Sequence, residues 1–353
     1  LLPLGPVVII DTAGIDDVGE LGKMRSERAR QILSRTDIAV LVIDSQAGIR
    51  DYDIMMITEF RKRSIPFILA FNKSDLNTMQ DYAMADVPDL SEVHTICVSA
   101  LTGSGINELK ELLGSVGRSA QTERELISDL IRPGDLAVLV TPIDESAPKG
   151  RLILPQQQTI RSILDIHAMN IVVQETELEK VLGSLSVKPA IVITDSQVFS
   201  EVNRIVPDDI LLTSFSILFA RYKGELYEFV HGAAMLDKLK EGDTILMAEG
   251  CTHHRQCNDI GTVKLPAWIK KYTGKDFNYR YVSGTEFPED LSGVDLVIHC
   301  GACMLNEREV RSRTQIAIDA GVPITNYGIT IAHTNGILKR ALSPFPYIAA
   351  ELS

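Results

Sequence analysis

The chain has 353 residues, 45% of them hydrophobic and 23% charged, and a formal net charge of −12. At about 150 residues per domain, this length predicts two or three domains, and we expect three. The acidic balance opposes a broad phosphate-binding surface, so nucleic acid is not expected as the main partner.

No apolar run approaches the roughly 20 residues that span a bilayer, and the first residues lack the basic region and apolar core of a signal peptide. We therefore expect no membrane association and a cytoplasmic location. The five cysteines are an odd number, and three of them have metal-like spacing. This favours thiols and metal ligands over a disulfide framework.

The first segment, residues 1–120, alternates strands and helices. Apolar β-branched runs predict buried strands over residues 6–10, 38–44 and 66–71, with helices around 23–33 and 53–63. The first run ends in Asp11-Thr12-Ala13-Gly14, at the edge where α/β sheets bind ligands. Asp11 can hold Mg²⁺ there and Gly14 can approach a phosphate; the alternative is a strand that ends in a tight turn.

Two polar groups follow later strands of this segment. Asn72-Lys73-Ser74-Asp75 comes after one strand, and Ser99-Ala100 comes after a strand over 95–98. This order resembles the G3, G4 and G5 elements of translation-factor-like GTPase domains. The resemblance implies that Asp75 reads the guanine N–H edge, Asn72 braces the loops, Lys73 lies over the base, and Ser99 and Ala100 face O6. It implies GTP or GDP with Mg²⁺ as cofactors.

The phosphate-binding part of such a domain is not found. No G-x-x-x-x-G-K-[ST] motif occurs in the chain. We expect this loop to lie in residues that precede Leu1; the alternatives are a fragment, or a domain that does not hold triphosphate in the usual way. GTP hydrolysis is therefore expected of the intact protein.

The middle segment, residues 121–208, reads as a small α/β unit without a catalytic constellation. We expect a helix over 121–131 and strands over 136–140, 170–174 and 190–194. A domain without chemistry between two that carry it suits assembly. We interpret it as a dimerisation domain whose exposed strand edges pair with a second copy, which gives a homodimer.

The last segment, residues 209–353, carries most of the cysteines. One predicted strand, 243–248, leads into Cys251, and another, 294–298, leads into His299 and Cys300, with Cys303 three residues on. If the two strands are parallel neighbours, these cysteines meet at one edge of the sheet.

Three thiolates with loop surroundings favour a [4Fe-4S] cluster in which one iron lacks a cysteine. Zinc held by three cysteines and one histidine is the alternative. His253 and His299 are both candidates for the fourth position, and either could instead tune the site without binding the metal.

The Cys-x-His pair, the 45 residues between His253 and His299, and the His-Cys-x-x-Cys group together resemble the HydF family, the maturation GTPases of [FeFe]-hydrogenase. The stretch from Pro148 to Pro155 is similar to that family too. The resemblance implies a scaffold and carrier with a GTPase domain, a dimerisation domain and an iron-sulfur domain, in which Cys251, Cys300 and Cys303 hold the cluster. It implies a diiron subcluster precursor as cargo, radical-SAM hydrogenase maturases and apo-[FeFe]-hydrogenase as partners. A tRNA-modification-type GTPase with a structural metal site is the alternative.

Overall fold

The chain folds into two compact units, residues 1–123 and 124–353. The computed structural model describes residues 7–12, 32–76, 93–120, 124–143, 152–250, 260–284, 286–303 and 305–350. Its strands form three parallel sheets, which confirms the predicted α/β class. The sequence predicts three domains, whereas two of the three sheets belong to one compact unit.

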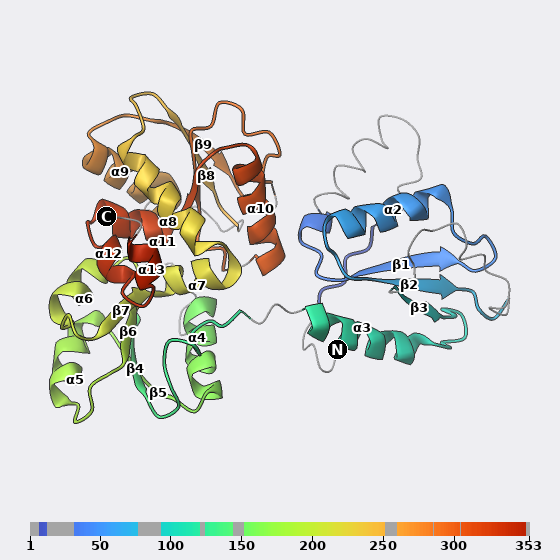
Figure 1. The fold of residues 1–353 in the computed structure, drawn as a ribbon, viewed down its shortest axis with the longest axis horizontal. Helices are drawn as coiled ribbons and strands as arrows, with labels where there is room; N and C mark the ends of the chain where they lie inside the picture. Colours follow the sequence, from blue (N-terminus) through green and yellow to red (C-terminus); the bar gives the residue numbers. More distant parts are fainter. Residues whose placement is uncertain are drawn as a thin grey trace. The chain divides into compact units, whose positions relative to one another are not determined.

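The first unit has a three-stranded parallel sheet in the order β1-β2-β3. Helices α2 and α3 lie on opposite sides of it (Figure 1). The central strand β2 is almost entirely apolar and buried, as a strand covered on both faces must be. The bounds are β1 Ala39–Asp44, α2 Asp51–Lys62, β2 Phe67–Asn72, β3 His94–Cys97 and α3 Ile106–Ala120.

Two expected elements differ in the structure. Residues 7–12 form no strand, and Val8 and Ile9 are 88% and 89% exposed. An apolar run becomes a strand only beside a ladder partner, and no described strand pairs with this one. The helix expected over 121–131 is also wrong for its described part, because residues 124–131 form turns. Leu126, Ile127 and Ile131 are nevertheless buried there, so tertiary packing overrides the local helix preference.

The second unit begins with a four-stranded parallel sheet in the order β5-β4-β6-β7. The expected domain division between residues 208 and 209 falls inside this sheet, because β7 follows it and pairs with β6. The bounds are β4 Leu136–Val140, α4 Leu154–Asp165, β5 Met169–Val173, α5 Leu178–Ser184, β6 Ile191–Thr194, α6 Phe199–Ile205, β7 Leu211–Ser214 and α7 Phe215–Lys223.

The third sheet has the order β11-β10-β8-β9, again parallel. The chain runs from β8 outward to β9 and then crosses to β10 on the other side, so β8 and β10 flank a topological switch point. Ligands of open α/β sheets bind at the carboxyl ends of such strands. The bounds are α8 Leu226–Ala234, β8 Thr244–Ala248, α9 Leu265–Thr273, β9 Asn278–Val282, β10 Leu296–His299, α10 Glu307–Asp319, β11 Ile324–Asn326, α11 Tyr327–Thr334, α12 Leu338–Ala341 and α13 Pro346–Ala349.

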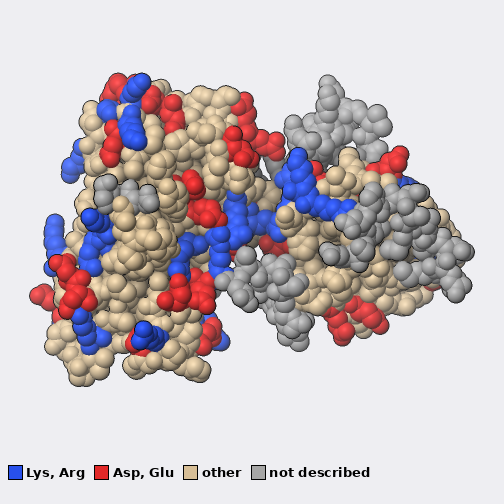
Figure 2. Space-filling view, viewed as in Figure 1, with Lys and Arg blue, Asp and Glu red and all other residues tan. Residues whose placement is uncertain are grey.

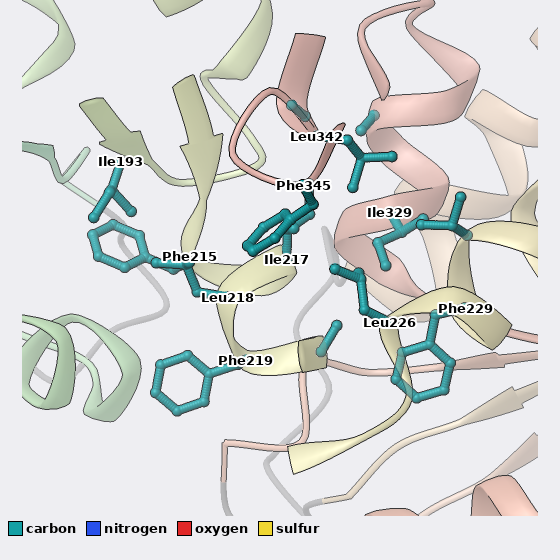
Figure 3. Packing of buried hydrophobic residues seen from close by; sticks show 14 of the residues in the cluster. Ile193, Phe215, Ile217, Leu218, Phe219, Leu226, Phe229, Ile329, Leu342 and Phe345 are labelled. Carbon is teal, nitrogen blue, oxygen red and sulfur yellow. The ribbon is translucent and has the colours of Figure 1, made fainter. Parts of the chain in front are cut away.

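One continuous hydrophobic core joins the two sheets of this unit. Helix α7 follows β7 directly, begins at the N-cap Ser214, and packs its apolar side chains against those of α8 and α11 (Figure 3). Phe215, Leu218 and Phe345 belong to this shared core. Because burial of each large apolar side chain contributes about 1.5–3 kcal/mol, the two sheets are expected to unfold together.

The surface of the second unit carries charges of both signs. Lys and Arg side chains are interspersed with Asp and Glu on the face shown in Figure 2. None of the helices in the described ranges combines the length and the apolarity needed to cross a membrane.

Candidate functional site

The first candidate site lies where β2 and β3 end. Asn72 closes β2, and its side-chain Oδ1 accepts a hydrogen bond from the Ala100 amide at 3.0 Å. The buried Ser99 hydroxyl donates to Oδ1 of Asp75 at 2.6 Å. These bonds tie the loop after β2 to the loop after β3 and fix the direction of the exposed Asp75 carboxylate. The structure thus brings together the residues that the sequence predicts as a guanine site.

Lys73 adopts a left-handed backbone conformation, with φ of +66°. For a residue other than glycine this is costly, and such strain persists only where the surroundings impose it. Here Ser45 holds the Lys73 carbonyl through its hydroxyl, at 3.0 Å. The Lys73 Nζ binds Oδ2 of Asp44 at 2.7 Å and thereby lowers the pKa of that carboxyl. Lys73 is therefore held on both its backbone and its side chain.

The loop after β3 is closed by a glycine. Gly105 has φ of +73°, and a Cβ there would lie 2.2 Å from the Cys97 carbonyl oxygen. The Ser99 amide donates to the Ser104 carbonyl at 2.9 Å across the same turn. Only glycine fits this close approach, which keeps Ser99 in place beside Asp75.

The structure describes one of the two remaining nucleotide candidates. Asp11 is exposed in the irregular stretch 7–12, and Gly14 lies outside the described residues. The constellation after β2 and β3 can offer a carboxylate to the N–H donors of a base, together with an amide and a backbone N–H.

The second candidate site lies at the switch point between β8 and β10. The Cys300 amide donates to the Ala248 carbonyl at 2.8 Å, which continues the pairing of the two strands. The Cys300 Sγ accepts a hydrogen bond from the Gly250 amide at 3.0 Å and lies 3.4 Å from the Ala302 amide. Cys251 follows Gly250 directly in the chain but, with His253, lies outside the described residues.

A buried lysine donates hydrogen bonds to the backbone of the loop that carries Cys300 and Cys303. We call residues 300–306 the cysteine loop. Lys223, at the end of α7, is 8% exposed, and its Nζ donates to the carbonyls of Ala302 at 3.0 Å and Leu305 at 2.7 Å. Burial lowers the pKa of Lys223, whereas the thiols of Cys303 and Cys300 act to raise it.

His299 is buried and fully hydrogen-bonded. Its Nε2 lies 3.0 Å from the Arg313 guanidinium, which can only donate, so Nε2 is the acceptor. Its Nδ1 therefore carries the proton and donates to the Cys300 carbonyl at 2.8 Å. Burial, followed by the Arg313 charge, lowers the pKa of His299 to about 3. Because both ring nitrogens are engaged inside the protein, this geometry disfavours His299 as a metal ligand.

The residues at the switch point suit an iron-sulfur cluster. Backbone N–H groups directed at a cysteine sulfur are the hydrogen bonds that tune such clusters, and Cys300 Sγ receives the one from Gly250. Within the described residues, no group of three or more His, Cys, Asp or Glu side chains is gathered as for a metal ion. Two of the three predicted ligand cysteines, Cys300 and Cys303, belong to that part of the chain.

Comparison with known proteins gives family matches for both compact units. A model of the elongation factor Tu GTP-binding domain matches residues 7–119. The fold and the first site therefore define a GTP-binding protein that carries two further α/β domains. Those domains match the hydrogen maturase F dimerization domain over residues 126–224 and the hydrogen maturase F tetramerization domain over residues 227–344. The chain belongs to the hydrogen maturase F family, as the sequence predicts.

Two individual relatives each match less than two fifths of the chain. The tRNA modification GTPase MnmE of Synechococcus sp. (strain JA-2-3B'a(2-13)) is 39% identical over 112 residues, which cover 31% of this chain and 22% of that protein. The GTPase Der of Streptococcus uberis is 32% identical over 152 residues, which cover 39% of this chain and 34% of Der. Mycobacterium tuberculosis shikimate dehydrogenase aligns with 63% of this chain at 11% identity, with a TM-score of 0.26 that is too low to indicate a shared fold.

Several residues of these sites escape sequence reasoning. Ser45 follows the apolar strand β1 at the sheet edge, which is the signal that could have found it. Lys223 and Arg313 lie inside ordinary helices, and their contacts join positions 79 and 14 residues apart. No local pattern predicts such contacts.

Proposed function

We propose that this protein is a scaffold and carrier in [FeFe]-hydrogenase maturation. It holds a [4Fe-4S] cluster at the switch point between β8 and β10 and delivers a diiron subcluster precursor to apo-hydrogenase. Family membership supports the maturation role. The cargo, the radical-SAM maturases that supply it and the apo-hydrogenase that receives it belong to the proposal.

One observation carries the cluster assignment. The Gly250 amide donates to the Cys300 sulfur at 3.0 Å. Because Cys251 is the next residue after Gly250 in the chain, this bond supports the assignment of Cys251 and Cys300 to one cluster. Cys303 lies in the same loop as Cys300, three residues further along the chain. These three thiolates would hold three irons of the cluster, and the fourth iron would offer an open position to an external ligand.

The fourth position is assigned by elimination among the histidines. His299 uses both ring nitrogens inside the protein. We therefore assign His253 as the remaining candidate histidine, with His299 as a residue that positions Cys300 through its carbonyl. A metal ligand needs a free ring-nitrogen lone pair, which His299 would gain only by breaking its bond to Arg313.

The nucleotide half of the proposal rests on the loops after β2 and β3. Asp75, held by Ser99, would accept hydrogen bonds from the guanine edge, and Asn72, bonded to Ala100, would keep the two loops together. Binding of GTP or GDP with Mg²⁺, and GTP hydrolysis, are proposed for the intact protein, with Asp11 and Gly14 on the phosphate side.

Metal analysis tests the cluster assignment. Anaerobic reconstitution with iron and sulfide should give about four irons per chain in the unaltered protein, as a [4Fe-4S] site requires. Cys300→Ala and Cys303→Ala should lose the iron. Cys97→Ala, at the end of β3 in the other unit, is the matched control and should keep it. Stoichiometric zinc without iron would sink the assignment.

The zinc outcome would favour a second candidate, a tRNA-modification-type GTPase with a structural metal site. The likeness to the tRNA modification GTPase MnmE supports this alternative, but it extends over only 112 residues. The two hydrogen maturase F domain matches favour the carrier, because they cover residues 126–224 and 227–344.

A further inference from the structure

A buried lysine connects α7 to the cysteine loop. The Lys223 Nζ has three N–H donors and meets three carbonyl oxygens of that loop: Leu305 at 2.7 Å, Ala302 at 3.0 Å and Cys303 at 3.4 Å. Ala302 has φ of +53°, a strained conformation for alanine. The ammonium thus holds the loop in a shape that its own backbone disfavours.

The same end of α7 is held by the first residue of the second unit. The Arg124 Nη1 donates to the Arg221 carbonyl at 3.2 Å and to the Gly224 carbonyl, and Nη2 binds the Glu225 carboxylate at 2.7 Å. The last carbonyls of a helix have no partner within it, so a guanidinium at this place satisfies them. Arg124 begins the unit directly after the boundary with the GTP-binding unit.

Arg124 also reaches the far end of the cysteine loop. Its Nε lies 4.0 Å from the carboxylate of Glu307, the first residue of α10. Helix α10 starts right after the loop, at the N-cap Asn306, whose side chain accepts the Glu309 amide at 2.9 Å. Arg124 therefore contacts both the end of α7, the helix that carries Lys223, and the start of α10, the helix that follows the cysteine loop.

We propose that Arg124 and Lys223 form a relay from the junction with the GTP-binding unit to the metal-ligating cysteines. In this relay Arg124 fixes the end of α7, and Lys223, carried by that end, positions the backbone of Cys300 and Cys303. The inference deepens the proposed function and rests on it for the identity of the cysteines as ligands. Both are positioning residues, because neither supplies a ligand atom.

The choice of residue types agrees with this role. A lysine ammonium directs three donors tetrahedrally and suits three separate carbonyls, whereas a planar guanidinium does not. Within the described residues, Lys223 bonds to no carboxylate at this site; its charge faces carbonyl oxygens and the thiol groups, and the carboxylate of Glu307 acts on it without a hydrogen bond.

Hydrogen–deuterium exchange of the metal-free protein tests the relay. Lys223→Met keeps the length of the side chain and removes the ammonium, and amide exchange of the peptide 300–306 should accelerate about tenfold. Arg124→Gln should accelerate it about threefold. The matched controls are Lys188→Met and Arg161→Gln, whose side chains form exposed ion pairs in the same unit and should leave the exchange unchanged.

A coupled relay has a second signature. The double variant of Lys223→Met and Arg124→Gln should exchange more slowly than the product of the two single effects predicts, because Arg124 acts largely through the end of α7 that carries Lys223. Multiplicative effects would show two independent supports and would overturn the relay.

The remaining outcomes also decide. Unchanged exchange of the loop in Lys223→Met, with the buried strand β4 still protected, overturns the proposal. If β4 loses protection in that variant, Arg124→Gln decides: faster loop exchange supports the relay, and unchanged exchange overturns it. Because no metal is present, a failure of iron to bind the unaltered protein would refute the proposed cluster and leave this result intact.

Discussion

At the scale of single residues, the base site depends on one carboxylate. Ser99 donates to one oxygen of Asp75, and the exposed remainder of that carboxylate faces solvent. Asp75→Asn exchanges an acceptor for a donor at that position. Loss of a hydrogen bond to a charged group costs about 1.5–3 kcal/mol, so guanine nucleotide affinity of the intact protein should fall roughly 10- to 100-fold.

A competition assay with a fluorescent guanine nucleotide measures this change. Asp51→Asn, an exposed carboxylate in the first turn of α2, is the control and should bind like the unaltered protein. Equal affinity in the Asp75 variant would refute the base-reading role. The iron content should be the same in all three proteins, since the cysteines lie in the other unit.

His299 predicts a pH dependence of stability. Its pKa in the folded metal-free protein is about 3, against 6.5 in the unfolded chain. Below pH 6.5 the unfolded chain binds a proton that the folded protein does not, so the free energy of unfolding falls as the pH falls. From pH 7.5 to 5.5 this contribution should cost about 1.4 kcal/mol.

Urea unfolding of the metal-free protein at the two pH values measures the effect. In His299→Gln, which can keep an acceptor for Arg313, the difference between pH 7.5 and 5.5 should shrink by about that amount. An unchanged difference would mean that His299 does not stay neutral in the folded protein.

At the scale of elements, β5 is an edge strand with exposed apolar side chains. Met169 and Val172 are 51% and 40% exposed, and β5 pairs with β4 alone in its sheet. Edge strands of this kind pair with other chains unless a charge prevents it. The match to a dimerization domain over this sheet agrees with that use.

Val172→Lys should therefore shift the protein from dimer to monomer, with at least about a tenfold weaker dimer, because a lysine at an edge disfavours pairing. Light scattering coupled to size-exclusion chromatography measures the mass. Leu164→Lys, a similarly exposed apolar position on α4, is the control. A dimer that survives Val172→Lys unchanged would place the interface elsewhere.

The sequence predicts elements well where period and register agree. The runs that became β1, β2, β8 and β10 are apolar, bounded by polar residues, and each has a ladder partner. The run at residues 7–10 has the same composition but no described partner, and pairing is a long-range property that composition does not encode. The turns at residues 124–131 escape prediction for the same reason, because long-range packing and not local composition determines them.

The residues of the candidate sites also differ in how well the sequence predicts them. Asp75, Ser99 and Cys300 follow strands directly, so chain order predicts their place at a sheet edge. Ser45 and Lys223 act across 28 and 79 residues, respectively, and only the folded chain brings them to their partners. His299 has ligand-like spacing, but its bond to the buried Arg313 decides its role.

At the scale of the whole molecule, two units separate two kinds of chemistry. The GTP-binding unit ends at residue 123, and one hydrophobic core joins the dimerization and tetramerization domains that follow. A shared core makes the cysteine loop sensitive to the sheet that the dimerization domain provides. Because Asp75 and Cys300 lie in different units, their variants should alter nucleotide binding and iron binding separately.

Delivery of cargo tests the central claim most directly. The intact protein is reconstituted with its iron-sulfur cluster, loaded with a diiron complex that carries CO and cyanide, and mixed with apo-[FeFe]-hydrogenase, and hydrogen evolution is measured. We predict that activity appears in proportion to the loaded protein and is lost when Cys300→Ala replaces it. Equal activation by the Cys300→Ala variant, or none by the loaded unaltered protein, would contradict the account.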